Sequence, residues 1–320
     1  MIAIHSQQPR YQTILVPLDG SALGELALPV AEALARQADA QLVLVRSVWR
    51  PESRQLDPVQ AQFEDLQAVK TYLADIAQRL GEQGLLVTRA FPDLPPAHSI
   101  LSEIEMHQAD LVVMSTHGRS GLGRWIFGSV AEAVLARSPV PVWLVRGIGR
   151  RPPALFEVAH PRLLVPLDGS PFGEAALPHA KALARLLDAT VVLLHVLPGA
   201  ASVEQEEPNH EAQGAGADLT DDTAAMRYLV VWAERLRLEG IRVQTTVLTG
   251  PAPETIIQAS QVSNIDLIVM GTHGRSGLPR VVLGSVALEV LRRGTLPVVL
   301  VRPTGLVHPE RLGESEESTR

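Results

Sequence analysis

A glycine-punctuated loop occurs twice in this chain, and its residues are suited to binding phosphate. The first copy occupies residues 113–122 and continues to Gly128-Ser129, and the second occupies residues 269–278 and continues to Gly284-Ser285. In each copy an apolar run ends at a polar loop, and the Gly-Ser pair opens an amphipathic segment, which predicts a strand, a loop and a helix. The free N–H groups and positive dipole end of such a helix attract an anion, and glycine allows it to approach the backbone closely.

Comparison of the two copies favours phosphate binding over a plain tight turn, which Gly-x-x-Gly loops also form. Residues 116–122 and 272–278 are identical, whereas the apolar positions that follow change from Trp-Ile-Phe at 125–127 to Val-Val-Leu at 281–283. Packing alone tolerates drift in a loop more readily than in a core. A Walker loop is excluded because Ser129 stands where Lys is required. A serine-nucleophile elbow is excluded because the Gly-x-Ser-x-Gly pattern is absent around Ser120.

A carboxylate follows the first strand of each half. Residues 13–18 and 162–167 read as short apolar strands that end at Asp19 and Asp168, and Ser21 is expected to cap a helix that runs to about residue 38. Beside a nucleotide, such a carboxylate accepts hydrogen bonds from ribose or adenine. The alternative for Asp19 is a purely local turn before the first helix.

Strands alternate with helices along both halves. In the first half we expect strands at residues 41–48, 85–91, 110–115 and 140–145, and helices at 59–83, 96–107 and 128–137. This alternation predicts an α/β fold of two tandem, doubly wound, five-stranded parallel sheets with strand order 3-2-1-4-5 and helices on both faces. The order reverses between strands one and four, so Asp19 and the 116–128 loop should form the two walls of one crevice.

The second half repeats the first. Asp19 matches Asp168 and Gly118 matches Gly274, and the spacing differs by about seven residues, which we assign to an insertion at about 198–222 that lacks an apolar period. We therefore expect one domain at 1–147, a linker at 148–159, a second domain at 160–303 and a polar tail at 304–320.

The amino-acid composition argues against several classes of function. The 320 residues carry a net charge of −7 and no cysteine, which argues against a nucleic-acid-binding surface, disulfides and thiolate chemistry. The chain shows no signal peptide and no apolar stretch of membrane-spanning length, so we expect a cytoplasmic protein that is not inserted in a membrane.

Taken together, these motifs resemble the universal stress protein family in its tandem, two-repeat form. ATP-binding members carry Gly-x-x-Gly, nine residues, and then Gly-Ser or Gly-Thr. The second half fits completely, with Gly271, Gly274 and Gly284-Ser285, and the first half departs by having Ser115 in place of the first glycine. The resemblance implies that ATP, with Mg²⁺, binds in the crevices. It also implies that backbone groups of Val45 and of Leu194-His195, at the end of strand two, face adenine.

The candidate nucleotide-binding residues come from the first strand, the end of the second strand, the loop and the following helix start of each half. They are Pro17, Asp19, Val45, Thr116, Gly118, Arg119, Gly128, Ser129 and Val130 in the first half, and Pro166, Asp168, Leu194, Gly271, Thr272, Gly274, Arg275, Gly284, Ser285 and Val286 in the second. Arg119 and Arg275 are expected to pair with phosphate rather than lie in solvent.

The two crevices are expected to differ in affinity. Leu94 aligns with Gly250, a second position at which the first half lacks a glycine. A Cβ at a position that requires positive φ costs on the order of 1 kcal/mol, so we expect the second crevice to bind ATP more tightly. The strands at 140–145 and 297–301 would otherwise be exposed apolar edges, so the halves should pack as a pseudo-dimer through them, with homo-oligomers a further possibility.

No enzyme constellation is visible. His117 and His273 lie in the loops, where a lone histidine is more typical of a local hydrogen bond than of a catalytic base. No set of His, Asp and Glu suggests a metal cage other than Mg²⁺ carried by the nucleotide. Three functions remain: a nucleotide-dependent switch or interaction protein in the stress response, an ATP-independent scaffold with empty crevices, and a slow ATPase.

Overall fold

The computed structural model describes residues 9–49, 58–116, 128–146, 154–199, 219, 221–273 and 283–303. The side chains of residues 58–65 and 154 are outside this description. The loop residues Gly118, Arg119, Gly274 and Arg275, most of the 198–222 insertion and the 304–320 tail also lie outside it.

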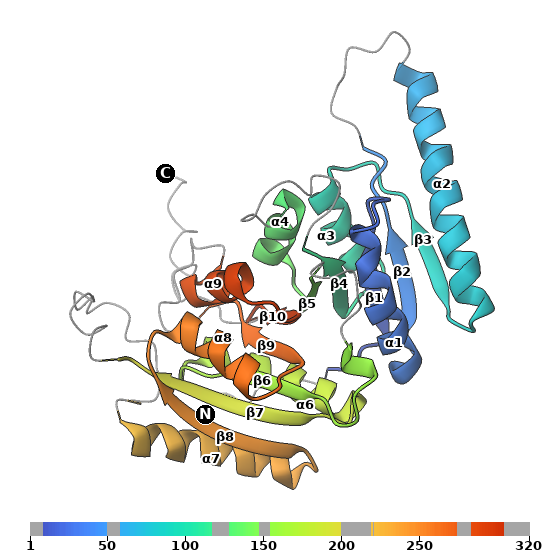
Figure 1. The fold of residues 1–320 in the computed structure, drawn as a ribbon. Coiled ribbons are helices and arrows are strands. Elements are labelled where there is room, and N and C mark those ends of the chain that lie inside the picture. The colour runs from blue at the N-terminus through green and yellow to red at the C-terminus, as the bar shows by residue number, and fades with distance from the viewer. Residues whose placement is uncertain are drawn as a thin grey trace, which may run out of the picture.

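Both halves are built from the same alternation of strands and helices (Figure 1). The first half contains β1 (Thr13–Pro17), η1 (Gly24–Ala27), α1 (Leu28–Ala38), β2 (Gln41–Val45), α2 (Pro58–Glu82), β3 (Val87–Ala90), α3 (Pro96–Met106), β4 (Leu111–Ser115), α4 (Ser129–Arg137) and β5 (Val142–Val145). After η2 (Ala154–Phe156), the second half contains β6 (Arg162–Pro166), α5 (Pro171–Glu174), α6 (Ala176–Leu186), β7 (Thr190–Leu197), α7 (Asp222–Leu238), β8 (Arg242–Thr249), α8 (Ala252–Val262), β9 (Leu267–Gly271), α9 (Ser285–Arg293) and β10 (Val298–Val301).

The strands form one ten-stranded sheet in the order β3-β2-β1-β4-β5-β10-β9-β6-β7-β8. Each half therefore has the expected order 3-2-1-4-5, with parallel pairing inside it. The halves join where β5 pairs antiparallel with β10, with Trp143 opposite Val299. The expected packing through the last strands is confirmed, and it merges the two predicted sheets into one.

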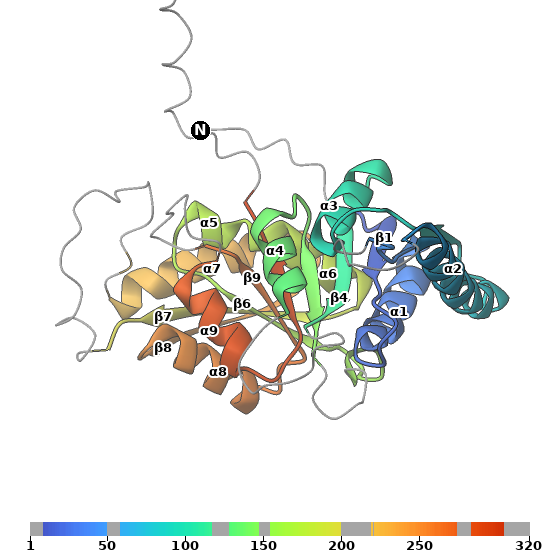
Figure 2. The same cartoon turned by 90° about the horizontal axis from the view of Figure 1, so that it is seen from above.

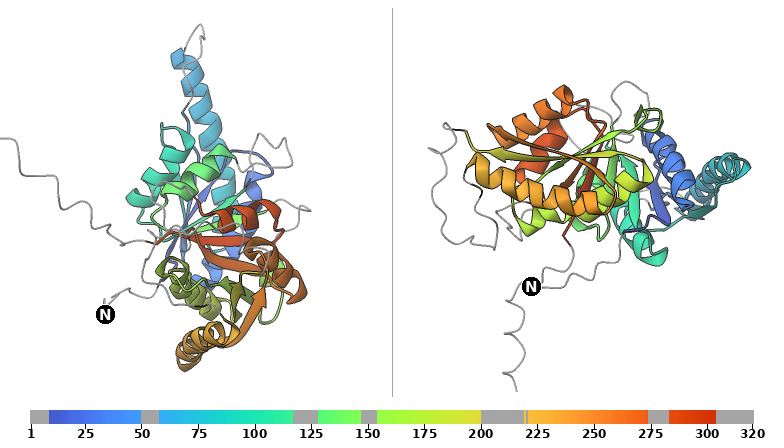
Figure 3. Two further views of the ribbon diagram at one scale, coloured as in Figure 1. Left: turned by 90° about the vertical axis from the view of Figure 1, so that its left-hand side faces the viewer. Right: turned by 90° about the horizontal axis from the view of Figure 1, so that it is seen from below.

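Two hydrophobic cores cover the two faces of this sheet, because parallel strands with helical crossovers bury both of their faces. One core contains apolar residues of α1, α2, α6 and α7, and the other contains those of α3, α4, α8 and α9. In Figures 1 and 2, α8 and α9 lie on one side of the second-half strands, and α7 lies on the other. Helices α2 and α7 contact β3 and β8, so they lie at opposite ends of the molecule (Figure 3).

Several element boundaries differ from the sequence-based expectation. Strand β2 ends at Val45 rather than residue 48, and the expected first helix is divided into the 3-10 turn η1 and helix α1. The Ser21 hydroxyl still accepts the Gly24 N–H at 3.0 Å, so it caps the turn rather than α1. In the second half Ser170 caps the short helix α5 in the same way, through Gly173.

Part of the predicted linker is ordered and packed. Leu155 in η2 is buried, and Phe156 stacks on the buried Trp143 with ring centroids 6.5 Å apart and planes inclined by 19°. Trp143 belongs to β5, which forms the seam between the halves by pairing with β10. This segment therefore packs at the seam. Leu155 belongs to the hydrophobic core that contains residues of both halves.

Arg146 connects the halves just after β5. Its guanidinium donates to the carbonyls of Val290, at 3.2 Å, and of Leu291 and Gly294, at the C-terminal end of α9. The Val290 carbonyl also accepts the Gly294 N–H at 2.9 Å, so Arg146 adds a second donor there. A cation also interacts favourably with the negative end of the helix dipole. Burial lowers the pKa of Arg146 to about 10, which leaves the side chain charged at neutral pH.

Replacing Arg146 by Ala should lower the free energy of unfolding by about 1–3 kcal/mol, because charge-assisted bonds to buried carbonyls are lost. Urea unfolding followed by circular dichroism measures this change. Arg302 is the matched control, since it follows β10 as Arg146 follows β5 but is exposed. Arg302→Ala should change stability by less than about 0.5 kcal/mol. Equal effects of the two substitutions would show that Arg146 does not stabilise the seam.

Candidate functional site

The candidate site of each half lies at the carboxyl ends of its strands. Pro17 pairs in register with Val45, and the Leu18 N–H donates to the Val45 carbonyl at 2.8 Å. The second half repeats this contact between Leu167 and Leu194, also at 2.8 Å. Strand β1 also pairs with β4, so the chain leaving β4 forms the other wall. The strands on the two sides of the predicted crevice are therefore the expected ones.

Asp19 and Asp168 shape the turn that follows the first strand. Oδ1 of Asp19 accepts the N–H of Ser21 at 2.9 Å and its hydroxyl at 2.7 Å. Oδ1 of Asp168 accepts the same two groups of Ser170, at 3.0 and 2.6 Å. The local turn considered for Asp19 is thus present in both halves. It fixes the orientation of each carboxylate at the crevice wall.

Two further glycines, Gly24 and Gly173, are required by this arrangement. A Cβ on Gly173 would lie 2.6 Å from Oδ1 of Asp168, and a Cβ on Gly24 would collide with Oδ1 of Asp19. The sequence analysis did not assign these glycines to the site. The available signal was the match of Gly24-Glu25 with Gly173-Glu174 beside the two aspartates.

The second wall joins the end of β4 or β9 to the start of a helix. The Thr116 carbonyl accepts the Gly128 N–H at 3.2 Å, and the Thr272 carbonyl accepts the Gly284 N–H at 2.8 Å. The two ends of each loop therefore lie next to each other, at the carboxyl end of β4 or β9. The amides of Thr116 and Thr272 are in turn bound to Val145 and Val301 of the seam strands, at 3.0 and 2.9 Å.

Helices α4 and α9 begin at this point without a side-chain cap. The N-cap residues Gly128 and Gly284 have φ values of −58° and −61°, which any residue adopts. Among the described atoms, a Cβ on Gly128 would approach only the Thr116 carbonyl oxygen, at 3.9 Å. Neither backbone conformation nor described packing thus requires glycine at 128. The first N–H groups of such helices are suited to bind an anion. Ser129 and Ser285 are exposed beside it.

The residue that follows Val45 in β2 differs from the one that follows Leu194 in β7. In the first half, Nη1 of Arg46 lies 2.7 Å from the ideal Cβ position of Gly20, and its guanidinium carbon lies 4.7 Å from the centre of the Tyr72 ring. In the second half, the equivalent His195 is buried and its Nδ1 lies 2.7 Å from the Leu167 carbonyl oxygen. The first crevice thus carries a guanidinium beside the Asp19–Gly20 turn. The sequence analysis did not single out Arg46.

Behind these residues both halves share a carboxylate held by a tyrosine. The Tyr72 hydroxyl donates to Glu25 at 2.9 Å, and the Tyr228 hydroxyl donates to Glu174 at 2.8 Å. Burial and then the neighbouring Glu25 raise the pKa of Tyr72, so it remains protonated at neutral pH. This bond ties the helix after strand two to the turn that carries the aspartate.

The described part of the loops contains no catalytic set. Nδ1 of His273 lies 3.0 Å from the buried Thr272 hydroxyl, a local hydrogen bond. Within the described residues, no three His, Asp or Glu side chains are grouped as a metal site, and no helix combines the length and apolar character needed to cross a bilayer.

The absence of glycine at Ser115 has a different physical meaning from the one expected. Gly271 is not among the positive-φ glycines, so the φ explanation is wrong for this position. A Cβ on Gly271 would instead lie 2.5 Å from the Phe172 carbonyl oxygen in α5. Gly250 does have a positive φ, of 151°. Leu94 is not among the positive-φ residues, so the aligned positions differ in backbone conformation.

Gly271→Ser should therefore destabilise the second half, because the α5 backbone must move away from the new Cβ. We expect a loss of about 1–3 kcal/mol in the free energy of unfolding, as for other overpacking substitutions. The reciprocal Ser115→Gly change should cost no more than about 1 kcal/mol, the entropic cost of glycine in a strand. Urea unfolding of the two variants compares them directly, and equal losses would contradict the close approach as the reason for Gly271.

Comparison with known proteins agrees with this architecture. The model of the universal stress protein family matches residues 10–146 and 160–302. A universal stress protein of Mycolicibacterium smegmatis is 29% identical over 299 residues, which cover 91% of this chain and 97% of that protein.

Solved structures give the same fold. A universal stress protein from Archaeoglobus fulgidus superposes with a TM-score of 0.66 at 23% identity, covering 91% of this chain and 97% of its own. A chain from Pseudomonas aeruginosa, described as a putative universal stress protein, gives 0.63 at 24% identity, with 92% and 95% covered. The family model covers both repeats, and the chain belongs to the universal stress protein family.

Proposed function

We propose that each crevice binds one ATP with Mg²⁺, and that the protein acts in the cytoplasm as a nucleotide-dependent switch or interaction protein of the stress response. The observation that carries this proposal is the repeated pair of walls. In both halves an oriented aspartate stands after β1 or β6, beside a strand whose following helix begins at an uncapped Gly-Ser pair.

The two walls are suited to different parts of a nucleotide. Asp19 and Asp168, together with the ends of β2 and β7, offer acceptors to ribose and base. The starts of α4 and α9 offer backbone donors, the serine hydroxyls and the positive end of a helix dipole to phosphates. The Val45 and Leu194 carbonyls already accept one amide each, so any further contact to adenine uses their second lone pair.

The crevices should differ in affinity, the second being the tighter. Gly271 completes the motif there, and His195 is turned away onto Leu167. In the first crevice the Arg46 guanidinium rests against Gly20, so a ligand that covers this turn must move it. This supports the expected ranking for a reason independent of glycine conformation.

Two other functions are tested by the same measurements. An ATP-independent scaffold would use the fold with empty crevices, and a slow ATPase would hydrolyse what it binds. We favour binding without efficient hydrolysis because the described residues offer no general base at the loop beyond His273, which is bonded to Thr272.

Isothermal titration of the purified protein with Mg-ATP should show binding at up to two sites per chain. Gly284→Val should weaken the second site by about ten-fold or more, because a β-branched side chain fills the space above the helix N-terminus. Thermal unfolding without nucleotide serves as the folding control. Absence of both heat and thermal stabilisation at millimolar ATP would favour the scaffold.

Asp19 and Asp168 separate the two sites. Asp168→Ala should remove the tighter site, and Asp19→Ala the weaker one. Each alanine also breaks the turn to Ser170 or Ser21, so Asp→Asn at the same positions provides the control. Asparagine keeps an acceptor for the serine while removing the charge. Titrations that assign the tighter site to Asp19 would reverse the ranking, although nucleotide binding would stand.

A further inference from the structure

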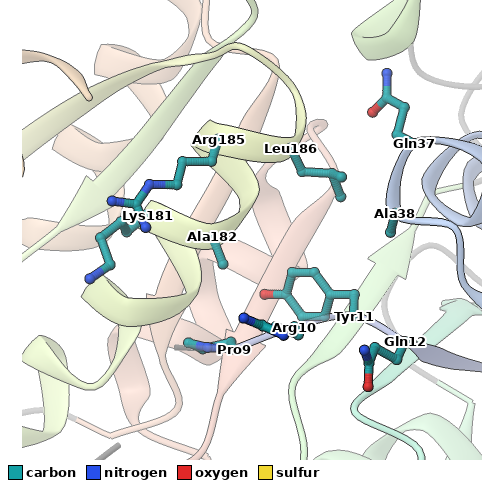
Figure 4. A pocket seen from close by; sticks show the side chains of 10 residues that line it. All are labelled: Pro9, Arg10, Tyr11, Gln12, Gln37, Ala38, Lys181, Ala182, Arg185 and Leu186. Carbon is teal, nitrogen blue, oxygen red and sulfur yellow. The ribbon is translucent and has the colours of Figure 1, made fainter. Parts of the chain in front are cut away.

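A cavity of about 380 Å³ lies between the two halves, a size typical of small-molecule sites. It is lined by the segment that precedes β1, by the end of α1 and by the second half of α6. Figure 4 shows Tyr11 between the α6 residues Lys181, Ala182 and Arg185 on one side and the α1 residues Gln37 and Ala38 on the other. The cavity is separate from both crevices, since none of the candidate nucleotide-binding residues lines it.

The lining is cationic. Arg10, Lys181 and Arg185 contribute positive charges, and the described lining residues include no carboxylate. The nearby Glu239 is shared by two of these cations, with Oε2 at 2.8 Å from Lys181 Nζ and 3.0 Å from Arg185 Nη2. A hydrogen bond from Lys181 is the largest influence that holds the pKa of Glu239 below its usual value. Two of the three lining cations thus share one carboxylate among the residues that the structure describes.

The wall formed by Tyr11 is fixed by a contact across the seam. Its ring is buried, and its hydroxyl lies 3.2 Å from Nδ1 of His179 in α6. Burial lowers the pKa of His179 to about 4, so the imidazole is neutral at pH 7 and adds no charge. Behind this segment Asp110 accepts the Gln12 N–H at 2.8 Å, and burial raises the pKa of Asp110 to about 6.

The repeat offers an internal comparison for these residues. With the offset that relates Asp19 to Asp168, Arg10 corresponds to Ala159 and Lys181 to Glu32. Tyr11 corresponds to His160, which is exposed and paired with Asp188 at 2.8 Å in its own half. The fold is thus formed with neutral or acidic residues at these positions. Arg185 corresponds to Arg36, so two of the three cations, Arg10 and Lys181, have no cationic counterpart in the other half.

We propose that this seam cavity binds a small organic anion, a carboxylate or phosphate monoester, through Lys181, Arg185 and Arg10. Pro9, Ala38, Ala182 and Leu186 supply an apolar surface for the carbon portion of the ligand. Because the lining comes from both halves, the bound anion stabilises the joined form of the protein.

Titration calorimetry at low ionic strength tests the proposal, with citrate and glycerol phosphate as probes. Glu239→Gln frees Lys181 and Arg185 from their carboxylate and should tighten probe binding by about five-fold, whereas Lys181→Gln should weaken it by a similar factor. Glu254→Gln is the matched control, because Glu254 in α8 pairs with Arg293 in α9 and neither residue lines the cavity. It should leave probe affinity unchanged.

Each outcome decides the proposal. Opposite changes in Glu239→Gln and Lys181→Gln, with no change in Glu254→Gln, support the seam site. Equal affinities in all variants, an equal gain in Glu254→Gln, or no saturable binding even in Glu239→Gln overturn it. Anions held at the helix starts of the crevices respond to none of these substitutions, so the result is independent of ATP binding. Urea unfolding of each variant confirms that it is folded.

Discussion

The antiparallel pairing of β5 with β10 is the interaction on which the rest of the architecture depends. Every residue of Val142–Val145 and Val298–Val301 is buried. As open edges, these apolar strands would present unpaired backbone groups to other chains. Paired with each other, they unite two five-stranded sheets into one, whose ends are β3 and β8. The contact of Tyr11 with His179 joins residues of the two halves, and Phe156 stacks on Trp143 of the paired strand β5.

This pairing also determines where the crevices lie. Strands within each half are parallel, and the strands of the two halves run in opposite directions. The carboxyl ends of the strands in one half therefore point the opposite way from those in the other half. The crevices are therefore separate sites, but a continuous set of contacts runs between them. The Val145 carbonyl accepts the Thr116 amide in the first crevice, and the next residue, Arg146, caps the end of α9, whose start forms the second crevice. These contacts join the C-terminal end of α9 to the strand that holds the other loop.

Much of this arrangement could be predicted from the sequence, because it depends on periodicity and repetition. Alternating apolar strands and helices predict parallel α/β units, and the duplicated Asp and Gly-Ser elements indicate where the two walls of each predicted crevice begin. The apolar edges at 140–145 and 297–301 predict the seam. What could not be predicted depends on distances between segments far apart in the chain. Arg46 reaches Gly20 and Tyr72 only in the folded state, and Gly271 is needed because the Phe172 carbonyl lies beside it. The division of the first helix into η1 and α1 coincides with Pro29, which lacks the N–H needed to continue the preceding turn.

The duplication separates what the fold requires from what each half does by itself. The bond between Tyr72 and Glu25 recurs as Tyr228 with Glu174, and the aspartate turns recur with the same geometry, so these features belong to the shared scaffold. Arg46 and His195 occupy equivalent positions but contact different groups, and Lys181 stands where the other half has Glu32. Both choices are compatible with the same backbone order. The repeated fold therefore dictates neither choice, and each is a feature of one half alone.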